Sequence, residues 1–212
     1  MDALLANPTL TFVWIISLVL AITFHEAAHA FAADRLGDPT PRSQGRLSIN
    51  PFNHIDLLGT ILVPLLLLIS TGGRFAFGWA KPVIFDPYNL KHPRKDAAII
   101  SLAGPGVNLA MAVLGSLIAR FVLPPFYAPV MYPLVIVNVS LALFNLVPVH
   151  PLDGAKIVLG LLPLDLAAEW QVLMRRYGTL ILLLLIIPFN GVSPLMTLIG
   201  PLIDGVLRLL LP

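Results

Sequence analysis

The sequence of 212 residues contains no cysteine and little charge. The absence of cysteine excludes a disulfide framework, a thiol nucleophile and a thiolate metal site. Charged residues make up 11% of the chain, whereas soluble globular domains carry about 25%. Thirteen Lys and Arg against eleven Asp and Glu give a net charge of only +2, too small a surplus for a nucleic-acid-binding domain. With 58% hydrophobic residues and a mean hydropathy of +0.90, the composition excludes a soluble enzyme and predicts a membrane domain.

Long apolar runs predict an all-α polytopic membrane protein. The run from residue 3 to residue 24 has no charged side chain, and because a spanning helix needs about 20 apolar residues, it predicts a helix over 9–34. The other apolar runs occupy 57–71, 97–122, 127–149, 177–188 and 193–211. The run 177–188 is too short to cross unless its helix begins near Leu166. The sequence therefore predicts about six transmembrane helices in a single membrane-embedded domain, residues 1–212.

A short β or re-entrant element is expected between the first and third of these helices. The connection 34–56 is polar and rich in turn residues, and its stretch 45–50 is a candidate strand. The segment 75–85 is apolar, but Gly78 and Pro82 oppose a helix there. Since irregular backbone at membrane depth must be buried in protein or line a wet cavity, we interpret 75–85 as re-entrant or interfacial. A loop lying on the surface is the alternative.

The distribution of Lys and Arg predicts the orientation in the cell membrane. If 57–71 crosses outward and 75–85 returns, Arg74 and Arg120 fall on one side of the bilayer. Nine basic residues then share the other side: Arg35, Arg42, Arg46, Lys91, Arg94, Lys95, Lys156, Arg175 and Arg176. The positive-inside rule makes this second side cytoplasmic.

The first helix contains a His-Glu-x-x-His motif formed by His25, Glu26 and His29. Residues four apart are about 40° apart around a helix, so both imidazoles project from one face, as a zinc site requires, and Glu26 lies near enough to serve a metal-bound water. Each ionisable group in a membrane helix costs about 3 kcal/mol or more, which favours a functional reason for all three. Histidines that merely bond neighbouring helices would leave Glu26 unexplained. If the helix enters the bilayer near Leu10, His25 lies about 22 Å further along, close to the cytoplasmic face.

Two histidines need a third protein ligand to leave one zinc position open for water. Glu169 is the one other glutamate, which disfavours a third ligand of the kind found in soluble zinc peptidases. Four candidates remain near apolar helices: His54, His92, His150 and Asp153. His92 lies in a basic stretch and is expected to be solvated. Asp153 follows a helix that prolines break, so its carboxylate turns back toward the membrane, but His150 competes with it.

The motif in the first helix is paired with a distant N-x-x-P-x-x-P-L-D-G at 145–154. This pairing resembles the site-2 protease family of intramembrane zinc metalloproteases, and the segments 45–56, 78–83 and 103–108 match as well. The resemblance implies one zinc per chain, held by His25, His29 and Asp153, with Glu26 as general base. It also implies transmembrane proteins as substrates, cut within the bilayer in regulated intramembrane proteolysis. Where the family has a second glycine after the aspartate, this chain has Ala155, and its length is that of a minimal bacterial or archaeal member without a PDZ domain.

Three further residues are candidates for contact with the substrate. Asn145 and Asn108 are uncharged donors at membrane depth, where a donor stabilises the oxyanion of peptide hydrolysis. Interhelical hydrogen bonding, common for Asn in bundles, is the alternative for both. His54 is expected at the cytoplasmic mouth of the site, unless it is an ordinary loop histidine.

Two other functions use the same residues. A metal-ion transporter would need ligands at several depths, and this chain concentrates them at one level. A catalytically inactive membrane chaperone of the same fold would not need Glu26. The expected partners are therefore transmembrane substrates and the lipid bilayer, with no nucleic acid.

Overall fold

The computed structural model describes residues 8–63, 66, 69, 78, 80–188 and 191–211. These residues form helices, and no strand occurs among them. The α-helices are α2 (Pro8–Arg35), α3 (Thr40–Ser43), α5 (Pro93–Phe121), α6 (Tyr132–Asn145), α7 (Asp153–Leu161), α8 (Leu164–Ile186) and α9 (Pro194–Leu210). Short helical turns are η1 (Pro51–Asn53), η2 (Leu57–Leu62, a π-helix), η3 (Pro87–Asn89) and η4 (Ala128–Met131). The prediction of an all-α chain is confirmed, and α2 begins and ends within one residue of its predicted range.

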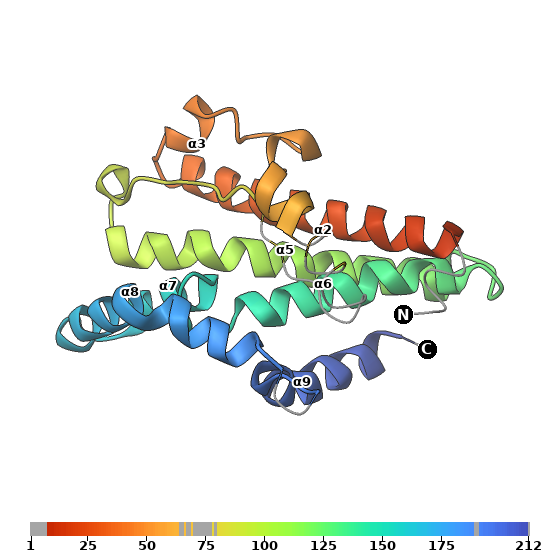
Figure 1. Ribbon diagram of the computed structural model, residues 1–212. Helices are drawn as coiled ribbons and strands as arrows, with labels where there is room; N and C mark the ends of the chain where they lie inside the picture. The colour runs from red at the N-terminus through yellow and green to blue at the C-terminus, as the bar shows by residue number, and fades with distance from the viewer. Residues whose placement is uncertain are drawn as a thin grey trace.

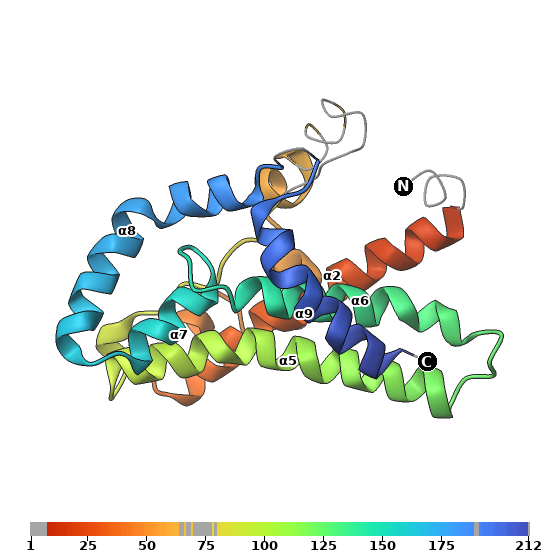
Figure 2. The ribbon, with the colours of Figure 1, turned by 90° about the horizontal axis from the view of Figure 1, so that it is seen from below.

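Three helices of the described chain are long and apolar enough to cross a membrane: α2, α5 and the stretch Ala128–Asn145 that joins η4 to α6. They run lengthwise beside one another, with α5 packed against both α2 and α6 (Figure 1). The prediction of about six spans is not confirmed. α9 has only 17 residues, and α8 carries four charged side chains within its first 13 residues, Asp165, Glu169, Arg175 and Arg176. α8 bows away from the α5–α6 pair before the chain returns through α9 (Figure 2). The run 57–71 lies partly outside the described residues.

The region expected to hold a β or re-entrant element consists of a loop and an extended segment in the described residues. The stretch 45–50 is not a strand but a loop, closed by hydrogen bonds from the Asn53 amide to the Gly45 carbonyl (3.2 Å) and between His54 Nε2 and the Ser48 carbonyl (2.8 Å). Of the segment 75–85, residues 75–77 and 79 lie outside the described chain. Residues 80–86, which we call the strap, are extended and non-helical. The strap has no strand partner among the described residues, and three of its backbone N–H groups donate elsewhere: Lys81 to the His54 carbonyl (3.0 Å), Val83 to Glu26 Oε2 (3.0 Å) and Asp86 to Asp38 Oδ2 (2.7 Å).

Asp38 ties the end of the strap to the end of α2. Its side chain is inaccessible to solvent. Oδ1 accepts from the Thr40 N–H (3.0 Å), the Thr40 hydroxyl (2.6 Å) and the Asn89 amide (2.8 Å), and Oδ2 accepts from Asp86 N. Burial opposes ionisation of this carboxyl, but the hydrogen bonds from Thr40, Asn89 and Asp86 hold its pKa below the ordinary value for aspartate. Both oxygens of Asp38 therefore accept hydrogen bonds, from Thr40 and Asn89 at Oδ1 and from Asp86 at Oδ2.

We expect Asp38→Asn to destabilise the protein by about 1–3 kcal/mol at neutral pH, because an amide has one accepting oxygen and leaves a buried donor unpaired. Since the folded-state pKa of Asp38 is lowered, its contribution is present above the ordinary pKa of about 3.9 and is lost as the pH falls through the folded value. Thermal unfolding of purified protein between pH 7 and pH 3 measures this. The difference in Tm between wild type and variant should be constant down to about pH 4 and then shrink.

Asp34→Asn is the matched control for this prediction. Asp34 pairs with the exposed Arg42 side chain at 2.6 Å, and exposed ion pairs contribute about 0–1 kcal/mol. Equal Tm values for Asp38→Asn and wild type would show that the strap does not depend on Asp38.

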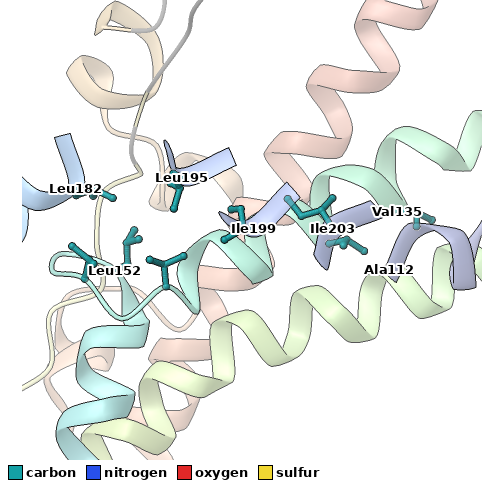
Figure 3. Close-up of a cluster of buried hydrophobic side chains, with 10 residues drawn as sticks. Ala112, Val135, Leu152, Leu182, Leu195, Ile199 and Ile203 are labelled. Atoms are coloured by element: carbon teal, nitrogen blue, oxygen red, sulfur yellow. The ribbon is translucent and has the colours of Figure 1, made fainter. Parts of the chain in front are cut away.

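The largest buried hydrophobic cluster holds the turn between α6 and α7 in place (Figure 3). It joins α5, α6, the turn 147–152, α8 and α9 through Ala112, Val135, Val139, Val147, Val149, Leu152, Leu182, Leu195, Ile199 and Ile203. α8 approaches this turn closely at Gly178, where a side chain would lie 2.6 Å from the Cβ of His150. Packing on several sides thus fixes the turn that leads to Asp153.

Candidate metal centre

Three buried side chains from two helices converge on one point. His25 and His29 lie one turn apart on α2, and their Nε2 atoms are 3.0 Å apart. Asp153 is the first residue of α7, and its Oδ2 lies 3.2 Å from His25 Nε2 and 3.1 Å from His29 Nε2. The two imidazoles and the carboxylate are each less than a tenth exposed. They form the one group of potential metal ligands found among the described residues.

The opposite sides of both imidazoles are held by acceptors. His29 Nδ1 lies 2.7 Å from the Ile100 carbonyl, which can only accept, so His29 carries a proton on Nδ1. His25 Nδ1 lies 2.6 Å from Asn108 Oδ1. The Asn108 amide nitrogen donates to the Ala21 carbonyl (3.0 Å) and to Asn138 Oδ1 (2.8 Å), so its oxygen faces His25, which also carries its proton on Nδ1. In the neutral histidines, both Nε2 lone pairs therefore point toward the carboxylate.

This donor set fits zinc. Two neutral imidazole nitrogens and a carboxylate are common zinc ligands, and bonds of about 2.0–2.1 Å in a tetrahedron place ligand atoms about 3.3 Å apart. The separations of 3.0–3.2 Å between the three atoms are close to that value. Three acceptors facing one another repel without a cation between them, and acceptors behind metal-ligating histidines are the usual means of fixing their rings.

Two glycines make room for the centre. A Cβ at Gly104 of α5 would lie 2.5 Å from His29 Nε2 and 2.7 Å from His25 Cε1, so α5 can approach the imidazole pair only with glycine there. A Cβ at Gly154 would collide with the carbonyls of Leu146 and Val147. Ala155, where the family has glycine, is buried, and its carbonyl accepts from Trp170 Nε1 at 3.0 Å.

The centre opens onto a cavity of about 360 Å³. Its wall is mainly apolar, and the polar residues in it are His25, Glu26, His29, Ser101, Asn145, Asp153 and Lys156. Glu26 is held in this wall by the N–H of Val83, which donates to Oε2 at 3.0 Å. A metal centre, a carboxylate beside it and a largely apolar pocket are the elements of a hydrolytic site.

The three other predicted site residues, Asn145, Asn108 and His54, lie in different places relative to the cavity. Asn145 lies in the cavity wall, with its amide donating to the Leu141 carbonyl at 3.0 Å. Asn108 lies behind His25, away from the cavity wall, with its amide fully engaged. His54 is 1% exposed in the loop beneath the strap, and it is not among the residues of the cavity wall.

Of the candidates for the third ligand position, the structure brings Asp153 beside His25 and His29. His150 and His92 are exposed, and both lie outside the group formed by His25, His29 and Asp153. Sequence reasoning missed Ser101 and the Val83 N–H, because nothing in the local sequence brings α5 and the strap to this cavity. The place of Lys156 in the cavity wall could have been predicted, since it lies one helical turn after Asp153.

A buried His-His-Asp group that could hold a metal ion, beside helices long and apolar enough to cross a bilayer, is typical of a membrane metalloprotein. No protein-family model and no solved structure matches the chain. Curated proteins do match it, among them the following. A Bacillus subtilis protein named "Putative zinc metalloprotease YwhC" is 33% identical over 207 residues, covering 92% of this chain and 89% of its own length. Two proteins named Rip2 with the same description are 31% identical over 181 residues in Mycolicibacterium smegmatis and 32% over 144 residues in Mycobacterium tuberculosis.

The alignments with the two Rip2 proteins cover 82% and 66% of this chain, and 64% and 52% of their own lengths. The match to YwhC extends over nearly the whole of both proteins. The chain belongs to the site-2 protease family.

Proposed function

We propose that this protein is an intramembrane zinc metalloendopeptidase that hydrolyses peptide bonds within transmembrane segments of other proteins, as in regulated intramembrane proteolysis. The observation that carries the proposal is the placement of His25, His29, Asp153 and Glu26 around one cavity. The relatives named as zinc metalloproteases support both the metal and the reaction class. We expect one zinc per chain.

Each residue of the centre has a role in this reaction. When bound, zinc supplies a water nucleophile of lowered pKa and polarises the scissile carbonyl. Glu26 takes a proton from the attacking water and gives it to the departing amine. The Val83 N–H holds Oε2 of Glu26, which leaves Oε1 for the proton. Asn145, in the cavity wall, is the amide donor for the oxyanion.

Asn108 is better suited to positioning than to contact with the oxyanion. Its oxygen accepts the proton of His25 Nδ1, and its nitrogen is used by Ala21 and Asn138. Holding this tautomer keeps His25 Nε2 free for the metal. His54, whose carbonyl accepts from Lys81 of the strap, supports the strap through its backbone.

The strap suits a substrate that must unwind. A helical segment hides its carbonyls in hydrogen bonds, so hydrolysis requires it to become extended. The strap is already extended and contributes Ala80, Pro82, Val83 and Phe85 to the cavity wall. The N–H groups of Lys81, Val83 and Asp86 are already used, so strand addition to an unwinding substrate relies on the remaining backbone groups of the strap.

A chelator experiment separates this function from its rivals. Purified protein incubated with a synthetic transmembrane peptide should cleave it, cleavage should stop with a zinc chelator, and added zinc should restore it. A metal-ion transporter or an inactive chaperone would leave the peptide intact in every condition. The single ligand group in the described chain favours the protease over a transport path with sites at several depths.

We also propose a multi-pass orientation with the metal centre near the cytoplasmic face. Arg35 ends α2, and Asp38 ties that end to Asn89, just before α5 begins. His25 lies ten residues before Arg35, or about 15 Å along the helix. By the positive-inside rule this end is cytoplasmic, so water reaches the centre from the cytoplasm. The substrate is then cut nearer its cytoplasmic end, releasing a fragment to the cytoplasm.

Cysteine labelling tests this orientation, and the chain has no native cysteine to remove. Single cysteines at Ser43, Asn89 and Ser193 would be treated in intact cells with a membrane-impermeant thiol reagent. We expect residues 43 and 89 to be protected and residue 193 to be labelled, because the basic residues cluster at the end of α2 that carries the first two. All three should react after the cells are opened. Strong labelling at 43 in intact cells would reverse the orientation.

A further inference from the structure

Ser101 is a buried residue of the cavity wall with an unused hydroxyl. It lies on α5, is 1% exposed and shares the cavity with Glu26 and His29. In the part of the chain that the structure describes, its Oγ has no hydrogen-bond partner. Ser116, the other buried serine of α5, differs in this respect because its hydroxyl donates to the Leu210 carbonyl.

Burying a hydroxyl without a hydrogen-bond partner lowers the stability of the fold, so such a group needs an explanation. Native proteins pair the large majority of buried polar groups, and a hydroxyl left without a partner loses its hydration with no compensation. Replacing Ser101 with alanine would remove this cost. A residue that lowers stability in this way, in the wall of a site, is typical of one whose partner is a ligand.

The backbone of Ser101 adds a second polar group at the same place. Pro105, four residues further along α5, has no N–H, so the Ser101 carbonyl lacks its usual helical donor. Ser101 therefore combines an unpaired hydroxyl with a carbonyl that lacks its usual helical donor. An extended peptide presents the complementary pair, a carbonyl and an N–H, and inside a membrane these groups need partners from protein.

α5 holds Ser101 in a fixed relation to the metal centre. The preceding residue, Ile100, accepts the proton of His29 Nδ1 at 2.7 Å. Gly104, almost one turn further on, packs against both imidazole rings. A group bound by Ser101 is thus held on the part of α5 that packs against the ligands.

We propose that Ser101 contacts the substrate, donating its hydroxyl to a backbone carbonyl of the segment that unwinds in the cavity. This inference rests on the proposed function. The hydrogen bond forms when the extended substrate binds and persists during the reaction. Its loss should therefore raise KM more than it lowers kcat.

Ser101→Ala and the matched variant Ser116→Ala test the proposal in the purified full-length protein. With a synthetic transmembrane peptide that the wild type cleaves, we expect Ser101→Ala to raise KM about 10-fold with a smaller change in kcat. Its Tm should equal or exceed that of the wild type. Ser116→Ala should do the reverse, lowering Tm because the Leu210 carbonyl loses its donor, and leaving KM unchanged.

A binding measurement makes the result independent of turnover. The affinity of the same peptide is compared between Glu26→Gln and Glu26→Gln with Ser101→Ala, and the double variant should bind about 10-fold more weakly. Equal affinity would overturn the proposal. So would a fall in Tm of Ser101→Ala as large as that of Ser116→Ala, since the hydroxyl would then have a structural partner. If the wild type cleaves no membrane peptide, the proposed function fails, while the binding comparison still decides on Ser101.

Discussion

Glu26→Gln should lower peptide cleavage by several orders of magnitude and leave zinc content unchanged. Glutamine keeps the size of the side chain but cannot accept the proton of the attacking water, and general-base catalysis alone contributes about 10²–10⁴-fold. Its amide oxygen can still accept from the Val83 N–H, as Glu26 Oε2 does at 3.0 Å, so the strap should stay in place. Single-turnover cleavage of a transmembrane peptide, together with metal analysis of the same sample, measures both effects.

Glu169→Gln is the matched control, because Glu169 is the one other glutamate of the chain and is exposed on α8. It undergoes the same chemical change away from the cavity wall, so cleavage should equal that of the wild type. If Glu26→Gln keeps more than about a tenth of wild-type activity, far above the loss expected for a missing base, Glu26 is not the proton acceptor. A loss of zinc in Glu26→Gln would instead assign the side chain to metal binding.

The part of the centre carried by one helix could be predicted from sequence. α2 follows from an uninterrupted apolar run, and the spacing of His25 and His29 is enough to place both imidazoles on one face. The observed Nε2 separation of 3.0 Å agrees with that expectation. Local periodicity needs no knowledge of the rest of the fold.

The parts that depend on tertiary packing could not be decided in this way. The choice between His150 and Asp153 depends on a turn whose shape is set by the cluster of α5, α6, α8 and α9, and by the contact of His150 with Gly178. The pairing of His25 with Asn108 joins residues 83 positions apart, and no spacing rule predicts it. The predicted strand at 45–50 failed because neighbouring loop residues satisfy its backbone.

The prediction of about six spans is not confirmed, because an apolar run does not by itself meet the length and composition of a spanning helix. α8 begins at Leu164, close to the Leu166 that a crossing helix would need, but its first 13 residues include four charged side chains. An apolar run alone is therefore a weak guide to whether a helix of the described chain matches the composition of a membrane span.

The second prediction with a large expected effect concerns the zinc content of the protein. Wild-type protein should contain close to one zinc per chain, and His25→Ala, His29→Ala or Asp153→Ala should reduce occupancy sharply, because two protein ligands hold zinc far more weakly than three. Elemental analysis of each purified variant measures this. His150→Ala is the control, since His150 is exposed and lies outside the ligand group. Full occupancy in Asp153→Ala with loss in His150→Ala would show that the third ligand is His150.

Two glycines of α5 test whether the ligand geometry itself is required. A Cβ at Gly104 would lie 2.5–2.7 Å from ring atoms of His29 and His25, whereas a Cβ at Gly106 would have no neighbour within 4 Å. Contacts that short force the imidazoles or α5 to move, so Gly104→Ala should lose zinc although every ligand is present. Gly106→Ala makes the same change two residues away on the same helix and should keep it. If Gly104→Ala holds zinc as tightly as Gly106→Ala, the imidazoles can shift without losing the metal, and α5 does not fix the centre.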